Sequence, residues 1–246
     1  DERGQPINAI LKTDGQPVTI GKIEKMSKSK NNGVDPQTTI DQYGADTVRL
    51  YTLFTAPADQ TLEWSDDALK GPYNFVKKVW RIATEHLQAI EHSAVSLEVF
   101  NSSLNNSMST KGLSNAAKNL RRKTHDTIGK IDKDLGDRLA LNTPVSSLME
   151  LSNELMSFKA ENEQDLYVQH EALVDLLTML SVYAPHVGEH LLEQLGLDTL
   201  TLRYPEVAAS ALVQDMITMI VQVNGKMRGK MDVAPNSDPE QLKIQA

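Results

Sequence analysis

Four lysines in one short polar stretch are the residues of this sequence that most directly indicate chemistry. Lys22, Lys25, Lys28 and Lys30 alternate with glycine, serine and asparagine over residues 21–33, named here the lysine loop. Ammonium groups neutralise phosphate oxygens, and serine hydroxyls and exposed backbone N–H groups add hydrogen bonds to them. Small residues let such a loop fold over a polyphosphate and open again. The spacing predicts phosphate binding, with a solvated charged loop as the simpler alternative.

The composition limits the classes of function that remain open. The chain has 246 residues, a formal net charge of -8 and no cysteine. Disulfides, thiolate zinc sites and cysteine nucleophiles are therefore excluded. The acidic balance argues against coating nucleic acid through the whole surface. Local basic patches remain possible, because salt confines each charge's influence to roughly 8–10 Å. No apolar run reaches membrane length, so a soluble cytoplasmic protein without membrane contact is expected.

A hairpin and a helix start are expected on either side of the lysine loop. Strand-like runs over residues 7–12 and 17–20 flank a turn at Gly15, where glycine tolerates a positive φ. After the loop, Asp35 is typical of a helix N-cap and Pro36 of the first helical position. The loop is therefore predicted to lie between a hairpin and a helix N-terminus.

Most of the remaining chain is expected to be helical. Apolar residues recur at three- and four-residue steps. The predicted helices cover residues 36–44, 45–54, 65–90, 113–135, 142–155, 166–180 and 185–196. The Ser- and Asn-rich stretch Glu91–Thr110 is predicted to be a loop. Four or five amphipathic helices with short connections pack most simply as an antiparallel bundle.

The periodicity changes near the C-terminal end. Apolar runs over residues 216–223 and 226–233 flank Asn224-Gly225, a strong hairpin signal. A further helix is expected from Ser237. A hairpin and two turns of helix are too little to close a core, so a truncated α/β domain is expected here.

Several blocks of the sequence share their residue order with one enzyme family. Residues 25–29 read KMSKS and residues 30–36 read KNNGVDP, with YGADTVRL at residues 43–50 and VQVNGKMRGK at residues 221–230. These blocks resemble the class I aminoacyl-tRNA synthetases, and among them the bacterial leucyl enzymes more than the isoleucyl and valyl ones. The resemblance spans almost the whole chain.

The resemblance implies a mainly α fold in four parts. These are a β-hairpin end of an upstream domain (1–24), the KMSKS loop and stem-contact region (25–70), the helical-bundle anticodon-binding domain (71–208) and the start of a C-terminal α/β tRNA-binding domain (209–246). The family's His-x-Gly-His motif is absent from the sequence. We therefore expect a C-terminal fragment that holds half of an ATP site and is inactive alone.

The resemblance also implies a reaction. Enzymes of this family join leucine to ATP as leucyl-adenylate, release pyrophosphate and transfer the leucyl group to tRNA(Leu). By resemblance, Lys25 and Lys28 are the catalytic residues, since they would stabilise the departing pyrophosphate. The ATP-binding candidates are Lys25, Met26, Ser27, Lys28 and Ser29. Mg²⁺ is implied with ATP in the full enzyme, no metal is expected in this part, and a monomer is expected.

Two basic clusters are candidate tRNA-binding surfaces. The candidates are Lys118, Arg121, Arg122 and Lys123 on the helix predicted over residues 113–135, and Lys226, Arg228 and Lys230 in the C-terminal hairpin. A two-residue turn would pair Val221 with Arg228 and place the three hairpin cations on one face. A solvated helix face and a charged edge strand are the simpler alternatives.

Two other interpretations stay open at this point. His186, Glu189 and His190 fit the H-x-x-E-H pattern of some zinc peptidases, although ordinary helix residues explain so short a pattern better. Another class I synthetase of the isoleucyl or valyl group, or a non-catalytic tRNA-binding protein, is the alternative function.

Overall fold

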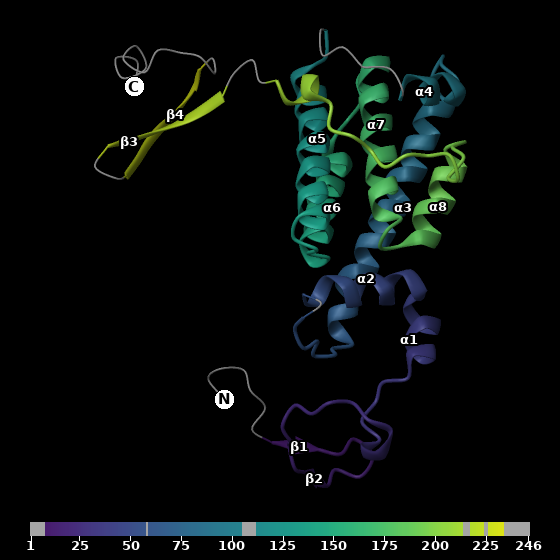
Figure 1. The fold of residues 1–246 in the computed structure, drawn as a ribbon, viewed down its shortest axis with the longest axis vertical. Helices are drawn as coiled ribbons and strands as arrows, with labels where there is room; N and C mark the ends of the chain where they lie inside the picture. Colours follow the sequence, from purple (N-terminus) through teal and green to yellow (C-terminus); the bar gives the residue numbers. More distant parts are fainter. Residues whose placement is uncertain (1–7, 58, 105–111, 214–216, 224–225, 234–246) are drawn as a thin grey trace.

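The computed structural model describes residues 8–57, 59–104, 112–213, 217–223 and 226–233 as an elongated arrangement of helices (Figure 1). The helices are α1 (Pro36–Tyr43), α2 (Ala45–Thr55), α3 (Lys70–Glu91), α4 (Leu97–Ser103), α5 (Asn115–Gly136), α6 (Asn142–Ser157), α7 (Glu163–Leu180) and α8 (Pro185–Gln194). The strands form two antiparallel hairpins, β1 (Ala9–Ile10) with β2 (Pro17–Val18) and β3 (Ile217–Val223) with β4 (Lys226–Val233). The prediction of a mainly α fold is confirmed.

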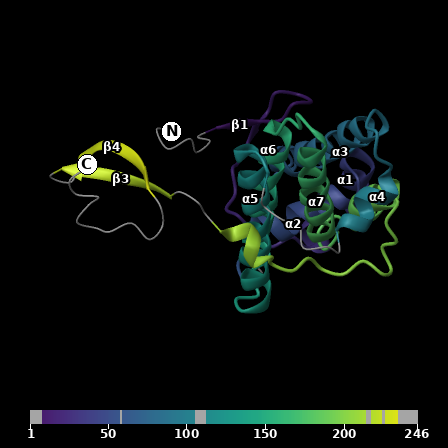
Figure 2. The ribbon, with the colours of Figure 1, turned by 90° about the horizontal axis from the view of Figure 1, so that it is seen from above.

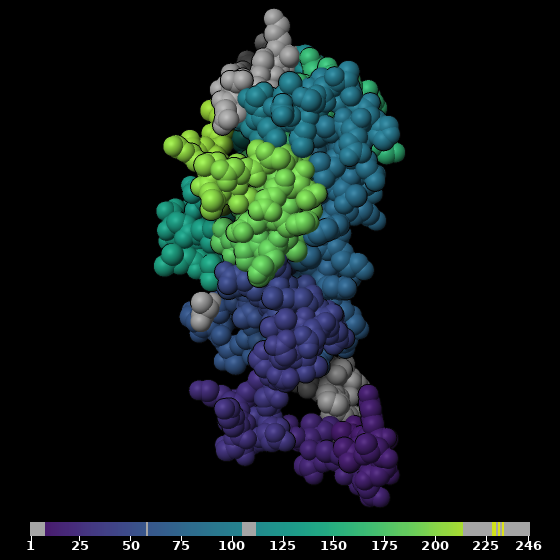
Figure 3. Space-filling model, turned by 90° about the vertical axis from the view of Figure 1, so that its right-hand side faces the viewer, coloured from purple at the N-terminus to yellow at the C-terminus, as the bar shows by residue number. Residues whose placement is uncertain are grey.

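The parts follow one another along the long axis of the molecule. The first hairpin and the lysine loop form a lobe at one end, α1 and α2 lie next to it, and the bundle of α3 and α5–α8 comes after them (Figures 1 and 3). The β3–β4 hairpin lies to one side of the bundle in two perpendicular views (Figures 1 and 2). The lysine loop is therefore far from the bundle, but joined to it through α1 and α2.

The bundle is held by apolar side chains at helical spacing. On α3, Phe75, Val79 and Ile82 are at most 3% exposed, and Leu173 and Leu177 on α7 are fully buried in the same cluster. Burying one such side chain is worth about 1.5–3 kcal/mol relative to exposure. Helix α5 packs on both α6 and α7, and its first turn is capped by Ser114, whose Oγ accepts from the N–H of Ala117 at 3.1 Å.

Helix α4 lies inside the stretch Glu91–Thr110, so the prediction of a loop there was wrong for Leu97–Ser103. Residues 105–111 are outside the described part of the chain. Asn101 holds α4 in place, because its Nδ2 donates to the Leu195 carbonyl at 2.8 Å and its Oδ1 contacts Nε2 of His170 at 2.9 Å. Phe100 is fully buried against the ring of Tyr167. These contacts are tertiary, and helical periodicity alone could not reveal them.

A chain of buried hydrogen bonds continues from Asn101 across the bundle. His170 Nδ1 lies 3.1 Å from His86 Nε2, and His86 Nδ1 lies 3.3 Å from the Gln169 amide. Because Asn101 Oδ1 is an acceptor, His170 carries its proton on Nε2 and accepts on Nδ1 from His86 Nε2–H. His86 Nδ1 must then accept from the amide nitrogen of Gln169. The side-chain nitrogen and oxygen of Gln169 are therefore assigned in exchanged positions, with the nitrogen towards His86. Both imidazoles are neutral in this arrangement.

Acid is expected to weaken the bundle through these two rings. Burial lowers the pKa of His86 to about 4. Burial, and then repulsion from His86 when that ring is protonated, lower the pKa of His170 to about 3. The unfolded chain takes up protons near pH 6.5, so stability from a neutral buried ring is present above 6.5 and lost as pH falls below it. The stability advantage of this chain over its His170→Asn variant should therefore shrink by on the order of 2 kcal/mol between pH 7 and pH 5.

Urea unfolding of both proteins across this pH range would measure the difference. The pH-dependent contributions of groups common to both proteins cancel in the difference between their unfolding free energies. The difference therefore reports the His170 imidazole. A difference that stays constant with pH would contradict a neutral buried His170.

The carboxylate of Asp46 joins α2 to the start of α8. Its Oδ2 accepts from the N–H of Val187 and its Oδ1 contacts His186 Nδ1, both at 2.7 Å. An acceptor from another helix thus satisfies a first-turn donor of α8. Arg49 adds a bond from Nη2 to the Val182 carbonyl at 3.1 Å, at the end of α7. These contacts fix the lysine-loop side of the molecule to the bundle.

The C-terminal hairpin has a different register from the one predicted. Val223 pairs with Lys226 as expected, but Val221 pairs with Gly229 instead of Arg228. The reason is a β-bulge between Val221 and Gln222, which leaves Arg228 as an extra residue on β4. Lys230 then pairs with Ile220, so the expectation of three cations at positions of one face was wrong. Asn224-Gly225 and the helix expected from Ser237 lie outside the described residues.

Candidate functional site

The lysine loop forms a tight turn at its centre. Lys28–Lys30 make one turn of 3-10 helix, with Lys30 N–H donating to Ser27 O at 3.3 Å and Asn31 N–H to Lys28 O at 3.2 Å. Asn31 has a φ of 50°, in the left-handed region that asparagine tolerates better than most residues. The chain therefore reverses directly after the KMSKS residues.

Asn32 spans this turn with its side chain. Its Oδ1 accepts from the Ser27 N–H at 2.8 Å and its Nδ2 donates to the Lys25 carbonyl at 3.4 Å. The sequence analysis did not single out Asn32, although an asparagine beside a loop is a residue type that commonly bonds to backbone. One amide thus holds both sides of Met26.

The predicted ATP-binding residues lie together in this turn. Lys25, Met26, Lys28 and Ser29 are exposed, Ser27 is half-buried, and the hydroxyls of Ser27 and Ser29 are 3.3 Å apart. Within the described residues neither Lys25 nor Lys28 forms a salt bridge, whereas Lys30 pairs with Glu24. The two ammonium groups predicted to act on phosphate are therefore not neutralised by a carboxylate of this part of the chain.

Helix α1 begins immediately after the lysine loop, as predicted. Asp35 accepts from the N–H of Gln37 at 3.2 Å and from the hydroxyl of Thr38 at 2.8 Å. These bonds, that from Thr38 first, lower the pKa of the Asp35 carboxyl. The N-cap fixes the exit of the loop.

Arg121 does not share the surface of α5 with its basic neighbours. It is 2% exposed, and its Nε and Nη2 donate to the two carboxylate oxygens of Glu171 on α7 at 2.8 and 3.2 Å. This is a bidentate ion pair within the bundle. The other three cations of the cluster are half-buried: Arg122 bonds Asn119, Lys123 pairs with Glu150 of α6 at 2.7 Å, and Lys118 lies one helical turn before Arg122.

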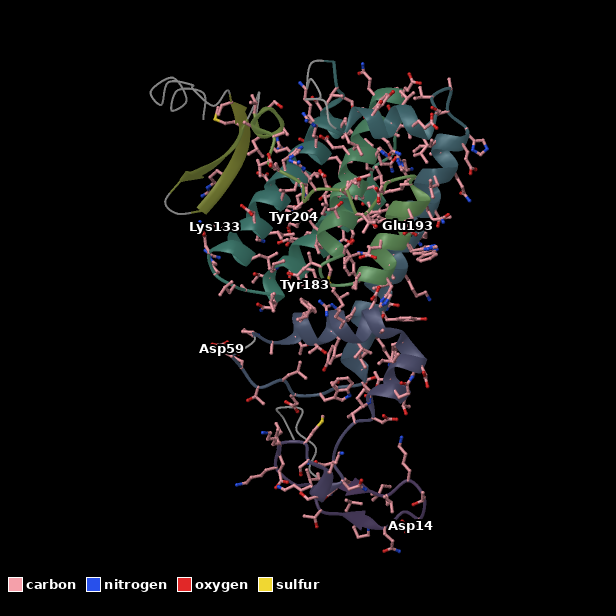
Figure 4. The ribbon with its side chains drawn as sticks, turned by 45° about the vertical axis from the view of Figure 1, so that its right-hand side comes forward. Asp14, Asp59, Lys133, Tyr183, Glu193 and Tyr204 are labelled. Atoms are coloured by element: carbon pink, nitrogen blue, oxygen red, sulfur yellow. The ribbon has the colours of Figure 1, made fainter. Side chains whose placement is uncertain are left out.

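The Arg121–Glu171 pair lines a cavity of about 670 Å³ between α5, α7 and the segment that follows α8. Tyr204 of that segment lies over the bundle above Tyr183 (Figure 4).

Ala208 N–H donates to His125 Nδ1 at 3.3 Å, so His125 carries its proton on Nε2, which lies 3.5 Å from Glu171. Burial would raise the pKa of Glu171, but His125 and Arg121 together lower it. Asp175 has the opposite shift: burial, then the Glu171 charge, raise its pKa to about 8.

The histidines of the H-x-x-E-H pattern have other partners. His186 contacts Asp46, and the ring of His190 stacks on that of Trp80 with 5.3 Å between centroids. Over the part of the chain that is described, no group of three or more His, Asp or Glu residues is placed to hold a metal ion. Nor is any described helix both long enough and apolar enough to span a bilayer.

Comparison with known proteins identifies the family of this chain. The sequence model described as the anticodon-binding domain of tRNA ligase matches residues 117–244, more than half of the chain. The chain belongs to this family. A second model, tRNA synthetases class I (I, L, M and V), matches residues 14–65, which include the lysine loop.

Relatives of this anticodon-binding family member are bacterial leucine–tRNA ligases. The ligase of Psychrobacter cryohalolentis is 80% identical over 246 residues, which are all of this chain and 26% of the relative. The ligase of Acinetobacter baumannii is 46% identical over all of this chain, which covers 27% of that relative. The chain thus spans about a quarter of the length of these relatives. The fold is shared with a crystal structure of LeuRS from Agrobacterium radiobacter K84 in ternary complex with tRNA and LeuAMS, at a TM-score of 0.73. The two sequences are 24% identical, and the match covers 90% of this chain and 27% of that chain.

Proposed function

We propose that this chain is the part of a leucine–tRNA ligase that supplies the KMSKS loop and tRNA-binding helices, in the four-part division given above. The observation that carries the proposal is 80% identity to such a ligase over all 246 residues. The whole enzyme would form leucyl-adenylate from ATP and leucine and pass the leucyl group to tRNA(Leu).

In this proposal Lys25 and Lys28 act on the triphosphate. Negative charge builds on the pyrophosphate as it leaves, and an ammonium group held nearby stabilises that charge without reorganisation of water. The exposed turn and the lack of carboxylate partners within the described residues support this role. Ser27 and Ser29 shape the turn around the phosphates, and Met26 anchors it.

Mg²⁺ would accompany ATP rather than bind to this part of the chain. The described residues offer no group of three or more carboxylate or imidazole ligands that could hold it. We propose that the complete enzyme works as a monomer in the cytoplasm.

Leucine-dependent exchange of pyrophosphate into ATP by the full-length protein tests the function. Exchange with leucine, and little with isoleucine or valine, is expected. Preference for isoleucine or valine would favour the other synthetases of the class, and no exchange with any amino acid would favour a non-catalytic tRNA-binding protein.

The basic residues of α5 and β4 outside the buried ion pair are the proposed tRNA contacts. On α5 they are Lys118, Arg122 and Lys123; Arg121 is left out because it is buried against Glu171. On β4 they are Lys226, Arg228 and Lys230, of which the exposed Arg228 occupies the bulge. A bulge re-aims a side chain away from the regular ladder, which suits a contact with a backbone phosphate.

Neutralising either cluster is expected to weaken tRNA binding by the full-length enzyme and reduce its salt dependence. Each lost phosphate contact should flatten the slope of log affinity against log salt by roughly 0.7–0.9. Affinities measured over a salt series for the wild type, a Lys118, Arg122 and Lys123 triple alanine variant, and a corresponding β4 variant would show this. Arg81→Gln, on the far helix α3, is the control. Slopes that match the wild type in both cluster variants would contradict the contacts.

A further inference from the structure

The turn at the centre of the lysine loop is held by few interactions. Two backbone bonds close it from within, and the Ser27 and Ser29 hydroxyls lie 3.3 Å apart. The Asn32 amide adds two bonds, accepting from Ser27 N–H at 2.8 Å and donating to Lys25 O at 3.4 Å. Ordering a residue costs about 1–2 kcal/mol of backbone entropy, while a net hydrogen bond returns about 0.5–1.5 kcal/mol. The closed turn is therefore only marginally favoured, and each of these bonds shifts its population.

Asn32 is the one described side chain whose bonds to backbone reach both sides of Met26. Accepting from Ser27 N–H and donating to Lys25 O requires a donor and an acceptor on one short side chain. Alanine has neither, and aspartate keeps only the acceptor. The outer ion pair of Lys30 with Glu24 is about half exposed at both ends, so it contributes little.

The bonds of Asn32 fix the backbone at Lys25 and Ser27, next to Lys28. The two ammonium groups proposed to stabilise the leaving pyrophosphate are therefore attached to the segment that Asn32 closes. Displacement of a catalytic group by about 1 Å can cost roughly 100-fold in rate. A residue that sets this backbone thus affects chemistry without contacting the substrate.

We propose that Asn32 is a positioning residue, which holds the KMSKS turn closed so that Lys25 and Lys28 meet the departing pyrophosphate. Its effect on the turn stands on the geometry alone, and its effect on catalysis rests on the proposed function. It should therefore influence adenylate formation and leave leucine binding unchanged.

The geometric half can be tested on this chain without any catalysis. Amide exchange at Ser27 should be roughly two- to tenfold faster in Asn32→Ala, because its acceptor is removed. Asn32→Asp keeps an acceptor and should retain most of the protection. Asn31→Gly is the matched control, since glycine accepts the positive φ and leaves Asn32 intact. Exchange at Ser27 that is equal in the wild type and Asn32→Ala would overturn the proposal.

The catalytic half needs the full-length enzyme. Asn32→Ala should slow leucine-dependent adenylate formation about tenfold or more, with the KM for leucine unchanged, and Asn31→Gly should match the wild type. Faster Ser27 exchange with a normal adenylation rate would overturn the positioning role. A wild-type enzyme without leucine-dependent exchange would instead contradict the proposed function, while the amide-exchange result still decides whether Asn32 closes the turn.

Discussion

Replacing Lys28 with alanine in the full-length enzyme is expected to slow leucyl-adenylate formation by about 2–4 kcal/mol of activation free energy, roughly 30- to 1,000-fold. The charge on the leaving pyrophosphate develops mainly in the transition state, so a cation that meets it there changes the rate more than ground-state binding. Single-turnover adenylate formation and the dissociation constant of leucine are the two measurements.

The matched control for Lys28 is Lys30→Ala. Both lysines belong to the same 3-10 turn and both are exposed, but Lys30 is paired with Glu24. Its loss should change the rate much less. Equal rate losses in the two variants would indicate that the loop acts through its overall charge. A Lys28→Ala loss that is as large in leucine binding as in rate would contradict the proposed role.

Replacing Arg121 with alanine is expected to destabilise this chain by about 3–5 kcal/mol. The substitution leaves the Glu171 carboxylate in the bundle without its bidentate partner, next to Asp175. An uncompensated charge in a site of low dielectric costs more than the ion pair itself contributes. Urea or thermal unfolding of the 246-residue chain would measure the loss.

Arg122→Ala is the control for Arg121, because the two residues are adjacent on α5 and Arg122 bonds only to the neighbouring Asn119 in the described structure. Its effect on stability should be within about 0.5 kcal/mol. Replacing both Arg121 and Glu171 with leucine should recover much of the stability lost in Arg121→Ala, since no lone charge remains. Similar stability losses for Arg121→Ala and Arg122→Ala would show that the buried pair is not structurally important.

Residue order alone was enough to predict most helices. Apolar residues on α3, α5, α6 and α7 recur with the helical period, and Asp35 with Pro36 marks the start of α1. These patterns involve residues within about one helical turn of each other, so they can be recognised without knowing the fold. The KMSKS motif is equally local, and the class I tRNA synthetase model matches residues 14–65 around it.

The predictions that failed depend on contacts that the local residue order does not specify. Helix α4 exists because Asn101 reaches Leu195 and His170, which lie 94 and 69 residues further along the chain. The bulge at Arg228 shifts the hairpin register by one residue, which a count from Asn224-Gly225 cannot foresee.

By itself, the sequence determined the helical class, the position of the lysine loop before α1 and the chemistry that its lysines and serines can offer. Only the tertiary structure decided which charges are available. Arg121 and Arg122 are adjacent and chemically alike, yet one is buried against Glu171 and the other lies towards solvent. The reason is that successive residues on a helix point about 100° apart, so whether a cation meets water or a carboxylate depends on which helix packs against that side.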